Sequence, residues 1–287
     1  MTEPVAGVIH DIGYQRYQGT RLGRGYAVRS LYTHSLRTAY GFGRSAKAKV
    51  FPWLVVGIVG IVAVVVTAIR AASGQVAVSY LGLPDAVYPL LFLFAAILAP
   101  ELVSRDLRSG VLPLYFSRPL RRTDYALAKL AALVSAIWLL LAGAQLVMFL
   151  GGVFGVDGWS EAWEEIGELA KGLAYAAIHA AVIGVIAVLI ASLLSRRAVA
   201  APLVVAAFLV TVPVVGLLET AGDQTAQQLS GLFSPATLVL GVRLWLFGET
   251  EGVPDYGRFP PLYAAVTLGL VLVCVGLLLV RYRKVRA

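Results

Sequence analysis

The sequence predicts an all-α protein: a polytopic membrane helix bundle with six transmembrane helices. An interfacial helix precedes the first span, and short outer helices lie between the fifth and sixth. Two observations predict this fold class. Of the 287 residues, 59% are hydrophobic and 14% are charged, whereas soluble domains average about 45–50% apolar and about 25% charged residues. The apolar residues also collect in six runs, each long enough to cross the roughly 30 Å hydrocarbon core of a bilayer.

The expected spans alternate with polar segments along the chain. They are residues 52–69, 86–103, 125–154, 173–194, 198–218 and 262–280. Four prolines, Pro89, Pro100, Pro202 and Pro213, fall in or near the second and fifth spans. Proline frees a backbone carbonyl and permits a kink, so these two helices are expected to bend.

The distribution of charge predicts the topology. Segments 1–49, 104–129, 195–197 and 281–287 contain 20 of the 24 Lys and Arg residues, and 11 of the 16 Asp and Glu residues lie in the other loops. Cytoplasmic segments carry the excess of Lys and Arg in membrane proteins. Both termini are therefore expected in the cytoplasm. The net charge of +8 is attributed to this bias, and no nucleic-acid partner is expected.

The first 49 residues are polar and basic, without an apolar core and a cleavage site of small residues. No signal peptide is therefore expected, and the first span should remain as a permanent helix. Residues 1–27 are assigned to a cytoplasmic N-terminal arm and residues 28–287 to the membrane domain. Two interpretations of the arm stay open. It is a disordered basic tail, or an ordered arm whose tyrosines, such as Tyr14 and Tyr17, pack on a partner.

Residues 28–49 have the periodicity of an amphipathic helix. Apolar residues recur every three or four positions, with basic residues on the other positions. Such a helix lies in the membrane interface, with its basic face toward anionic headgroups. Its apolar positions include Leu31, Tyr32 and Leu36, and its basic positions include Arg29 and Arg37.

Two loops on the outer side contain further apolar segments. Residues 157–171 place Trp159, Trp163 and Ile166 on one helical face with glutamates elsewhere, which is typical of a short helix in the aromatic belt. Residues 238–247 are apolar but too few to span, which favours a re-entrant or surface helix that caps the bundle. Arg243 in this stretch is expected to snorkel toward headgroups or water.

The sequence contains no recognisable catalytic or metal-binding constellation. His10, His34 and His179 are too far apart for metal-ligand spacing, and no G-x-x-x-x-G-K-[ST] motif is present. We therefore expect no catalytic residue, metal or cofactor in this chain. An energised function would need ATP and Mg²⁺ on a second polypeptide. Polar residues in the spans are few and include Glu101, Gln145 and His179, which argues against an ion-coupled carrier.

Residues 104–129 join the second and third spans and are dense in Arg and Asp. Charges at Arg105, Asp106 and Arg108 suit a docking surface that binds a partner specifically. Leu107, Val111 and Leu112 would supply its apolar anchors. Glu101, at the end of span two, is expected to pair with Arg105 or Arg108 one turn on. This structural role is favoured over a proton relay.

This segment resembles the signature of type-2 ABC transporter permeases, the six-helix membrane subunits of drug, lipid and polysaccharide exporters. The positions that are similar to the family pattern are Arg105, Asp106, Gly110, Leu112, Leu114, Pro119, Arg122, Tyr125 and Lys129. The family also has an interfacial elbow helix, similar to residues 28–49, and short outer helices, similar to residues 234–247. The resemblance covers the chain from about Val28 to the C-terminus.

The resemblance implies a permease subunit of an ATP-driven exporter in the bacterial inner membrane. Two permeases, identical or paralogous, would pair on two ATPase subunits that bind ATP and Mg²⁺. The coupling segment would sit in a groove of the ATPase, and a path would open between spans two and five of the paired permeases. The residues of this segment are Arg105, Asp106, Leu107, Arg108, Gly110, Val111, Leu112 and Tyr115, and the structural signature adds Glu101, Pro119, Arg122, Tyr125 and Lys129.

Two alternatives stay open. The first is a membrane anchor or sensor subunit that does not transport and that binds partners through the basic arm. The second is an ion-coupled carrier, which the scarcity of charge in the spans disfavours. The chain itself is not expected to be an enzyme under any of the three interpretations.

Overall fold

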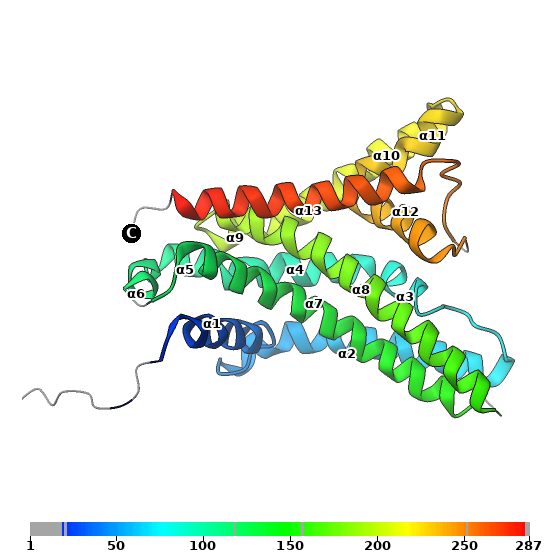
Figure 1. The fold of residues 1–287 in the computed structure, drawn as a ribbon, viewed down its shortest axis with the longest axis horizontal. Helices are drawn as coiled ribbons and strands as arrows, with labels where there is room; N and C mark the ends of the chain where they lie inside the picture. Colours follow the sequence, from blue (N-terminus) through cyan, green and yellow to red (C-terminus); the bar gives the residue numbers. More distant parts are fainter. Residues whose placement is uncertain (1–18, 20–21, 118, 156–157, 251, 285–287) are drawn as a thin grey trace, which may run out of the picture.

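The computed structural model describes residue 19 and residues 22–117, 119–155, 158–250 and 252–284, and every regular element in these residues is a helix (Figure 1). Most of the expected N-terminal arm lies outside the described residues. The helices are α1 (Arg24–Ala39), α2 (Ala46–Ser73), α3 (Gly82–Ala86), α4 (Tyr88–Leu102), α5 (Ser104–Arg108), α6 (Leu112–Phe116), α7 (Arg122–Val153), α8 (Trp159–Leu193), α9 (Arg197–Leu209), α10 (Thr211–Ala221), α11 (Gln224–Ser230), η1 (Gly231–Phe233), α12 (Pro235–Phe247) and α13 (Pro260–Arg283).

Five helical segments in the described residues are long and apolar enough to cross a membrane. They are α2, α7, α8, the consecutive pair α9 and α10 (Arg197–Ala221), and α13. This confirms an all-α bundle that fits a membrane-embedded protein. Residues 224–233 and α12 also form an apolar pair, bent by 110°. Short helices thus follow α10, as the sequence predicts.

The second expected span, residues 86–103, is shorter than predicted. Its helical part is α4, which has 15 residues and a length of about 22 Å. The helix breaks at Val87 and Val103, and Pro89 lies in its first turn. Phe94, Ala95 and Ala99 are fully buried, and α4 packs against α7, α8 and α9. Protein rather than lipid therefore surrounds much of this helix.

The centre of the bundle is the α7–α8 pair, the most extensive helix contact in the structure. Small residues let the two helices approach closely. Ala136 of α7 and Ala176, Ala180 and Ala187 of α8 are fully buried. Helices α1 and α2 pack on α7, and α13 packs mainly on α8 and α12. Helix α7 consequently runs along the middle of the bundle and contacts elements from both halves of the chain.

The helix expected over residues 28–49 is two helices. Helix α1 begins earlier, at Arg24, and ends at Ala39, and residues 46–49 form the first turn of α2. The physical reason is glycine: Gly41 and Gly43 have φ of 76° and 75°, a conformation that favours glycine and ends a helix.

Helix α1 is attached to α7 by hydrogen bonds as well as by apolar contact. The Tyr32 hydroxyl donates to Ser135 Oγ at 2.9 Å, and the Tyr40 hydroxyl donates to the carbonyl of Ala136 at 2.7 Å. Burial raises the pKa of Tyr40 to about 12, so its hydroxyl stays protonated and keeps this bond.

The short helix expected over residues 157–171 is the start of α8. This helix runs without a break for 35 residues from Trp159, about 52 Å, because no proline interrupts it. Trp159 and Trp163 are 79% and 57% exposed and touch edge to face with ring centroids 6.0 Å apart. Their exposure suits an interfacial position, although the helix that carries them is much longer than expected.

Close packing of α12 on α13 leads to the first prediction. A Cβ at Gly241 would lie 2.3 Å from the ring of the fully buried Tyr263. We expect Gly241→Ala to destabilise the protein by about 2 kcal/mol, because overpacking a core site typically costs 1–3 kcal/mol. The measurement is thermal unfolding in detergent. The control is Gly269→Ala, where a Cβ meets nothing within 4 Å. Equal melting temperatures for the two variants would contradict the packing.

Candidate functional site

The expected docking segment forms two short helices joined by a glycine turn. Helices α5 and α6 lie beside the start of α7, at the left in Figure 1. Between them Gly110 adopts φ of 64°, which a side chain disfavours. We call this end of the bundle the α5–α6 end. Arg105 and Arg108 are exposed there, and so is Leu114, at 69%.

The apolar anchors of the segment differ from those expected. Leu112 is 5% exposed and belongs to the core of the chain itself, and Leu107 packs against that core. Val111 is half-buried. These side chains hold α5 and α6 against the bundle, because their surface is already used within the chain. The outward-facing groups of the segment therefore include Arg105, Arg108 and Leu114.

Asp106 fixes α5 to α7. Its carboxylate accepts a hydrogen bond from the Tyr125 hydroxyl at 2.8 Å and forms an ion pair with Lys129 Nζ at 2.9 Å. Lys129 is only 4% exposed and lies 5.5 Å from the Tyr125 ring centroid. Ser104 adds a hydrogen bond of 2.8 Å to the carbonyl of Ala191 in α8. The structure thus brings together three of the expected residues, Asp106, Tyr125 and Lys129.

The remaining signature residues occupy the junction between α6, α7 and α13. Arg122 donates to the carbonyl of Arg283 at 3.0 Å, and its guanidinium lies 5.7 Å from the Phe116 ring centroid. Tyr115 lies with its ring centroid 5.6 Å from that of Tyr125. Pro119 is exposed in the turn before α7. The end of α13 is therefore held at the α5–α6 end.

Glu101 does not pair with Arg105 or Arg108, contrary to the prediction. Its carboxylate contacts Arg44 at 2.7 Å and Arg197 at 2.5 Å. These arginines are far away in sequence, one before α2 and one at the start of α9. The break at Val103 turns α5 away from the axis of α4, so the one-turn spacing of a continuous helix does not apply.

Helix α1 presents its predicted faces in part. Leu31 is buried, Tyr32 and Leu36 are half-buried, and Arg29 and Arg37 are exposed. At its start, Arg24 contacts both carboxylate oxygens of Asp124, at 2.6 and 2.7 Å. Asp124 also accepts the backbone amide of Arg121 at 3.0 Å. This pair joins the beginnings of α1 and α7.

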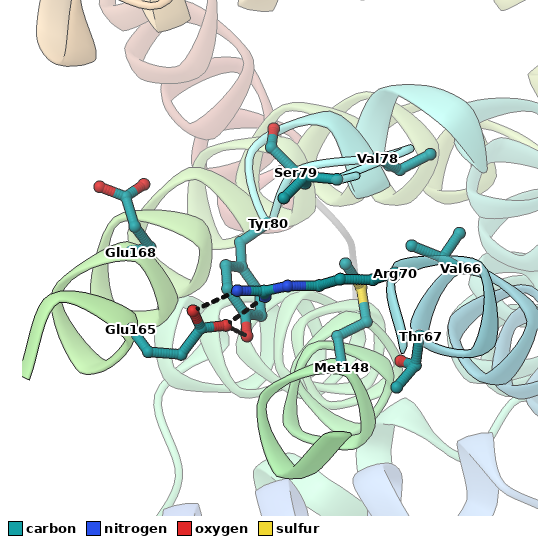
Figure 2. Close-up of a pocket in the computed structure, with 10 residues that line it drawn as sticks. Val66, Thr67, Arg70, Val78, Ser79, Tyr80, Met148, Glu165 and Glu168 are labelled. Carbon is teal, nitrogen blue, oxygen red and sulfur yellow. Dashed lines mark hydrogen bonds and ion pairs between the residues drawn. The ribbon is translucent and has the colours of Figure 1, made fainter. Parts of the chain in front are cut away.

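The opposite end of the bundle contains a pocket of about 200 Å³ between α2, α7, α8 and the loop before α3 (Figure 2). Arg70 reaches across it and contacts both oxygens of Glu165, at 2.6 and 2.8 Å. The Tyr80 hydroxyl also donates to Glu165. Burial, followed by the bond to Glu165, raises the pKa of Tyr80, which keeps the donor protonated. Gln145 donates to the carbonyl of Tyr80 at 2.8 Å.

Arg243 is buried rather than snorkelling, which corrects the prediction. It is 4% exposed and contacts Asp85 at 3.0 Å and Glu249 at 2.7 Å. Asp85 also accepts the Tyr175 hydroxyl at 2.9 Å and lies 3.2 Å from His179 Nε2. The cluster connects α3, α8 and α12. The sequence signal for it is a lone arginine in an apolar stretch, with Glu249 shortly after it, whereas Asp85 lies 158 positions away.

In the part of the chain that the structure describes, no group of three His, Cys, Asp or Glu side chains is arranged to hold a metal ion. The polar clusters at both ends are ion pairs and tyrosine hydroxyls, which hold helices together. A scan of protein-family models and a search of curated proteins found no match to this chain.

The pair in the pocket gives a second prediction. Glu165→Gln leaves Arg70 without its counter-charge, and breaking a buried pair typically costs about 3–5 kcal/mol. Arg70 is 30% exposed, so we expect about 2 kcal/mol, measured as a lower thermal midpoint in detergent. The control is Glu168→Gln, which removes another carboxylate from the same pocket. Glu168 pairs with Lys171, and because both side chains are 48% exposed, this pair contributes little. An equal loss in both variants would contradict the role of Glu165.

A third prediction concerns the attachment of α5. Asp106→Asn leaves the buried Lys129 ammonium uncompensated, so we expect a loss of about 3 kcal/mol. Adding Lys129→Met removes the stranded charge and should restore at least half of that loss. Thermal unfolding of the two single variants and the double variant measures the coupling. Strictly additive losses would show that the two side chains do not interact.

Proposed function

We propose that this chain is the permease subunit of an ATP-driven exporter that couples to a separate ATPase subunit. One observation carries the proposal: an exposed, charged, two-helix segment is fastened at one end of an apolar bundle. In this proposal α5 and α6 form the coupling segment, and the α5–α6 end is cytoplasmic. The resemblance of residues 105–129 to type-2 ABC permeases implies that the partner of this segment is an ATPase subunit.

The contacts of α5 support a mechanical role. Asp106 joins it to Tyr125 and Lys129 of α7, and Ser104 joins it to α8. A movement of the segment would therefore be passed to the central helix pair rather than absorbed in a loop. ATP and Mg²⁺ would be bound by the partner ATPase, in two copies, because this chain has no P-loop sequence.

Exposed apolar surfaces support a second permease subunit in the assembly. In α8, 61% of the most apolar 18-residue stretch is buried within the chain, but the share is only 28% in α2 and 22% in the α9–α10 segment. Val210 and Leu217 are 64% and 67% exposed. Such faces lie against lipid or against a second copy or paralogue. The proposed exporter has six spans per permease, α4 included, with both termini in the cytoplasm of a bacterium.

Co-purification tests the partner. The tagged full chain is isolated from its native membrane in mild detergent, and bound proteins are identified by mass spectrometry. We expect an ATPase subunit with a P-loop, and the same experiment reports a paralogous permease. An intact, monodisperse chain that brings down other membrane or signalling proteins and no ATPase would favour the anchor or sensor role and reject the exporter.

The glycine turn gives a fourth prediction. Gly110→Val places a β-branched residue at φ of 64°, so the turn between α5 and α6 must rearrange. We expect the variant still to insert into the membrane. In nanodiscs, the ATPase rate of the assembled complex should change toward that of the ATPase subunit without the permease. The control is Gly43→Val, which also has a positive φ (75°) and open space but lies outside the segment. An unchanged ATPase rate in Gly110→Val would reject the coupling role.

A further inference from the structure

Four arginines gather around one carboxylate at the α5–α6 end. A pocket of about 260 Å³ is lined by Arg44, Glu101, Arg105, Arg108, Ser195 and Arg197. These side chains come from the turn before α2, the end of α4, helix α5, the α8–α9 connection and the first residue of α9. Four guanidinium groups and one carboxylate give the lining a formal charge of +3. Such a lining attracts an anion.

Two of the arginines are already used and two are available. Arg44 and Arg197 form ion pairs with Glu101 at 2.7 and 2.5 Å. Among the residues that the structure describes, Arg105 and Arg108 have no ion pair or side-chain hydrogen bond, and both are exposed. Like charges held close together repel one another, so an anion seated between them would stabilise this junction.

The chemistry of the lining selects a phosphate group. The planar guanidinium fork matches phosphate oxygens and binds them with paired, charge-assisted hydrogen bonds. Ser195 adds a hydroxyl to the lining. Helix α9 begins here and has 13 residues, and the free amides of its first turn add partial positive charge.

The surroundings of the pocket favour a lipid over a soluble anion. Leu193 and Val199 flank the Ser195–Arg197 connection and are 59% and 51% exposed. The apolar parts of α8 and α9 end and begin at these residues. The pocket therefore lies where the apolar surface of the bundle meets its charged end, which is the depth of lipid headgroups.

A second cavity adjoins this pocket. It has a volume of about 540 Å³ and shares Arg44, Glu101 and Arg105 with the first. Ser35 also lines it, and its hydroxyl is buried without a hydrogen-bond partner among the described residues. A headgroup larger than a bare phosphate thus has room beside the arginines and a polar group to contact.

We propose that this arginine pocket binds the phosphate of an anionic membrane lipid, with its acyl chains against Leu193 and Val199. The bound lipid would neutralise Arg105 and Arg108 and join α4, α5 and α9. The proposal needs only that the chain is embedded in a membrane. It holds or fails independently of the exporter function.

The fifth prediction tests the pocket in the full chain without any partner. Delipidated protein in detergent is titrated with phosphatidylglycerol, and lipid adducts are counted by native mass spectrometry. Removing two arginines by Arg105→Gln and Arg108→Gln should weaken phosphatidylglycerol binding by roughly 30-fold, with little change for phosphatidylcholine. The control is Lys171→Gln with Arg258→Gln, which removes the same charge from exposed positions outside the pocket, on α8 and just before α13, and should leave binding near the wild-type value.

Several outcomes would overturn the proposal. Unchanged phosphatidylglycerol binding in Arg105→Gln/Arg108→Gln is one, and an equal loss in the Lys171→Gln/Arg258→Gln control is another, since it would indicate general attraction. Inorganic phosphate that binds as tightly as the lipid would point to a soluble anion instead. Ser195→Glu provides a second variant should the first fail to fold. It places a carboxylate in the pocket and should also weaken binding, and unchanged binding in this variant would count against the pocket.

Discussion

The structure depends on how ionised side chains are paired among apolar helices. Removing a charge from water costs several kcal/mol unless a counter-charge and hydrogen bonds replace the water. Asp106 with Lys129, Glu165 with Arg70, and Asp85 and Glu249 with Arg243 meet this condition. Asp106, Glu165 and Asp85 each lie on a different helix from their basic partner, whereas Glu249 follows α12, the helix that contains Arg243. Because lipid gives helices little reason to associate through apolar surface alone, these pairs fix which helices are neighbours and at what height.

The two ends of the bundle use charge differently. Away from α5 and α6, Arg70 and Arg243 are balanced by carboxylates within the chain. At the α5–α6 end, Arg105 and Arg108 exceed the available carboxylates and face outward. At the first end the positive charges are neutralised within the chain. At the α5–α6 end the excess positive charge can bind an anionic partner. The difference supports an external partner at the α5–α6 end, whether an ATPase groove, a lipid headgroup or both in turn.

Sequence reasoning succeeded where hydropathy alone decides the structure. The span expected over 125–154 is α7, and that over 262–280 is α13, because long apolar runs have few other solutions in a membrane. It failed where contacts between segments that are distant in sequence determine the position of a side chain. Arg243 and Asp85 are 158 positions apart, and the partners of Glu101 lie in two other segments. The break after Ala39 did have a local signal in Gly41 and Gly43, which an extended amphipathic pattern concealed.

Helix α7 connects the two ends of the molecule. Near its start Tyr125 and Lys129 contact Asp106 of α5, and one side of it contacts α1. Farther along, Trp138 donates to the carbonyl of Leu173 in α8, and Gln145 donates to the carbonyl of Tyr80 beside the Arg70–Glu165 pair. Its 32 residues contain no proline, so it has no hinge of that kind. A displacement of α5 would therefore move α7 as a unit and reach the pocket of Figure 2 directly, which gives the proposed coupling segment a continuous physical route across the bundle.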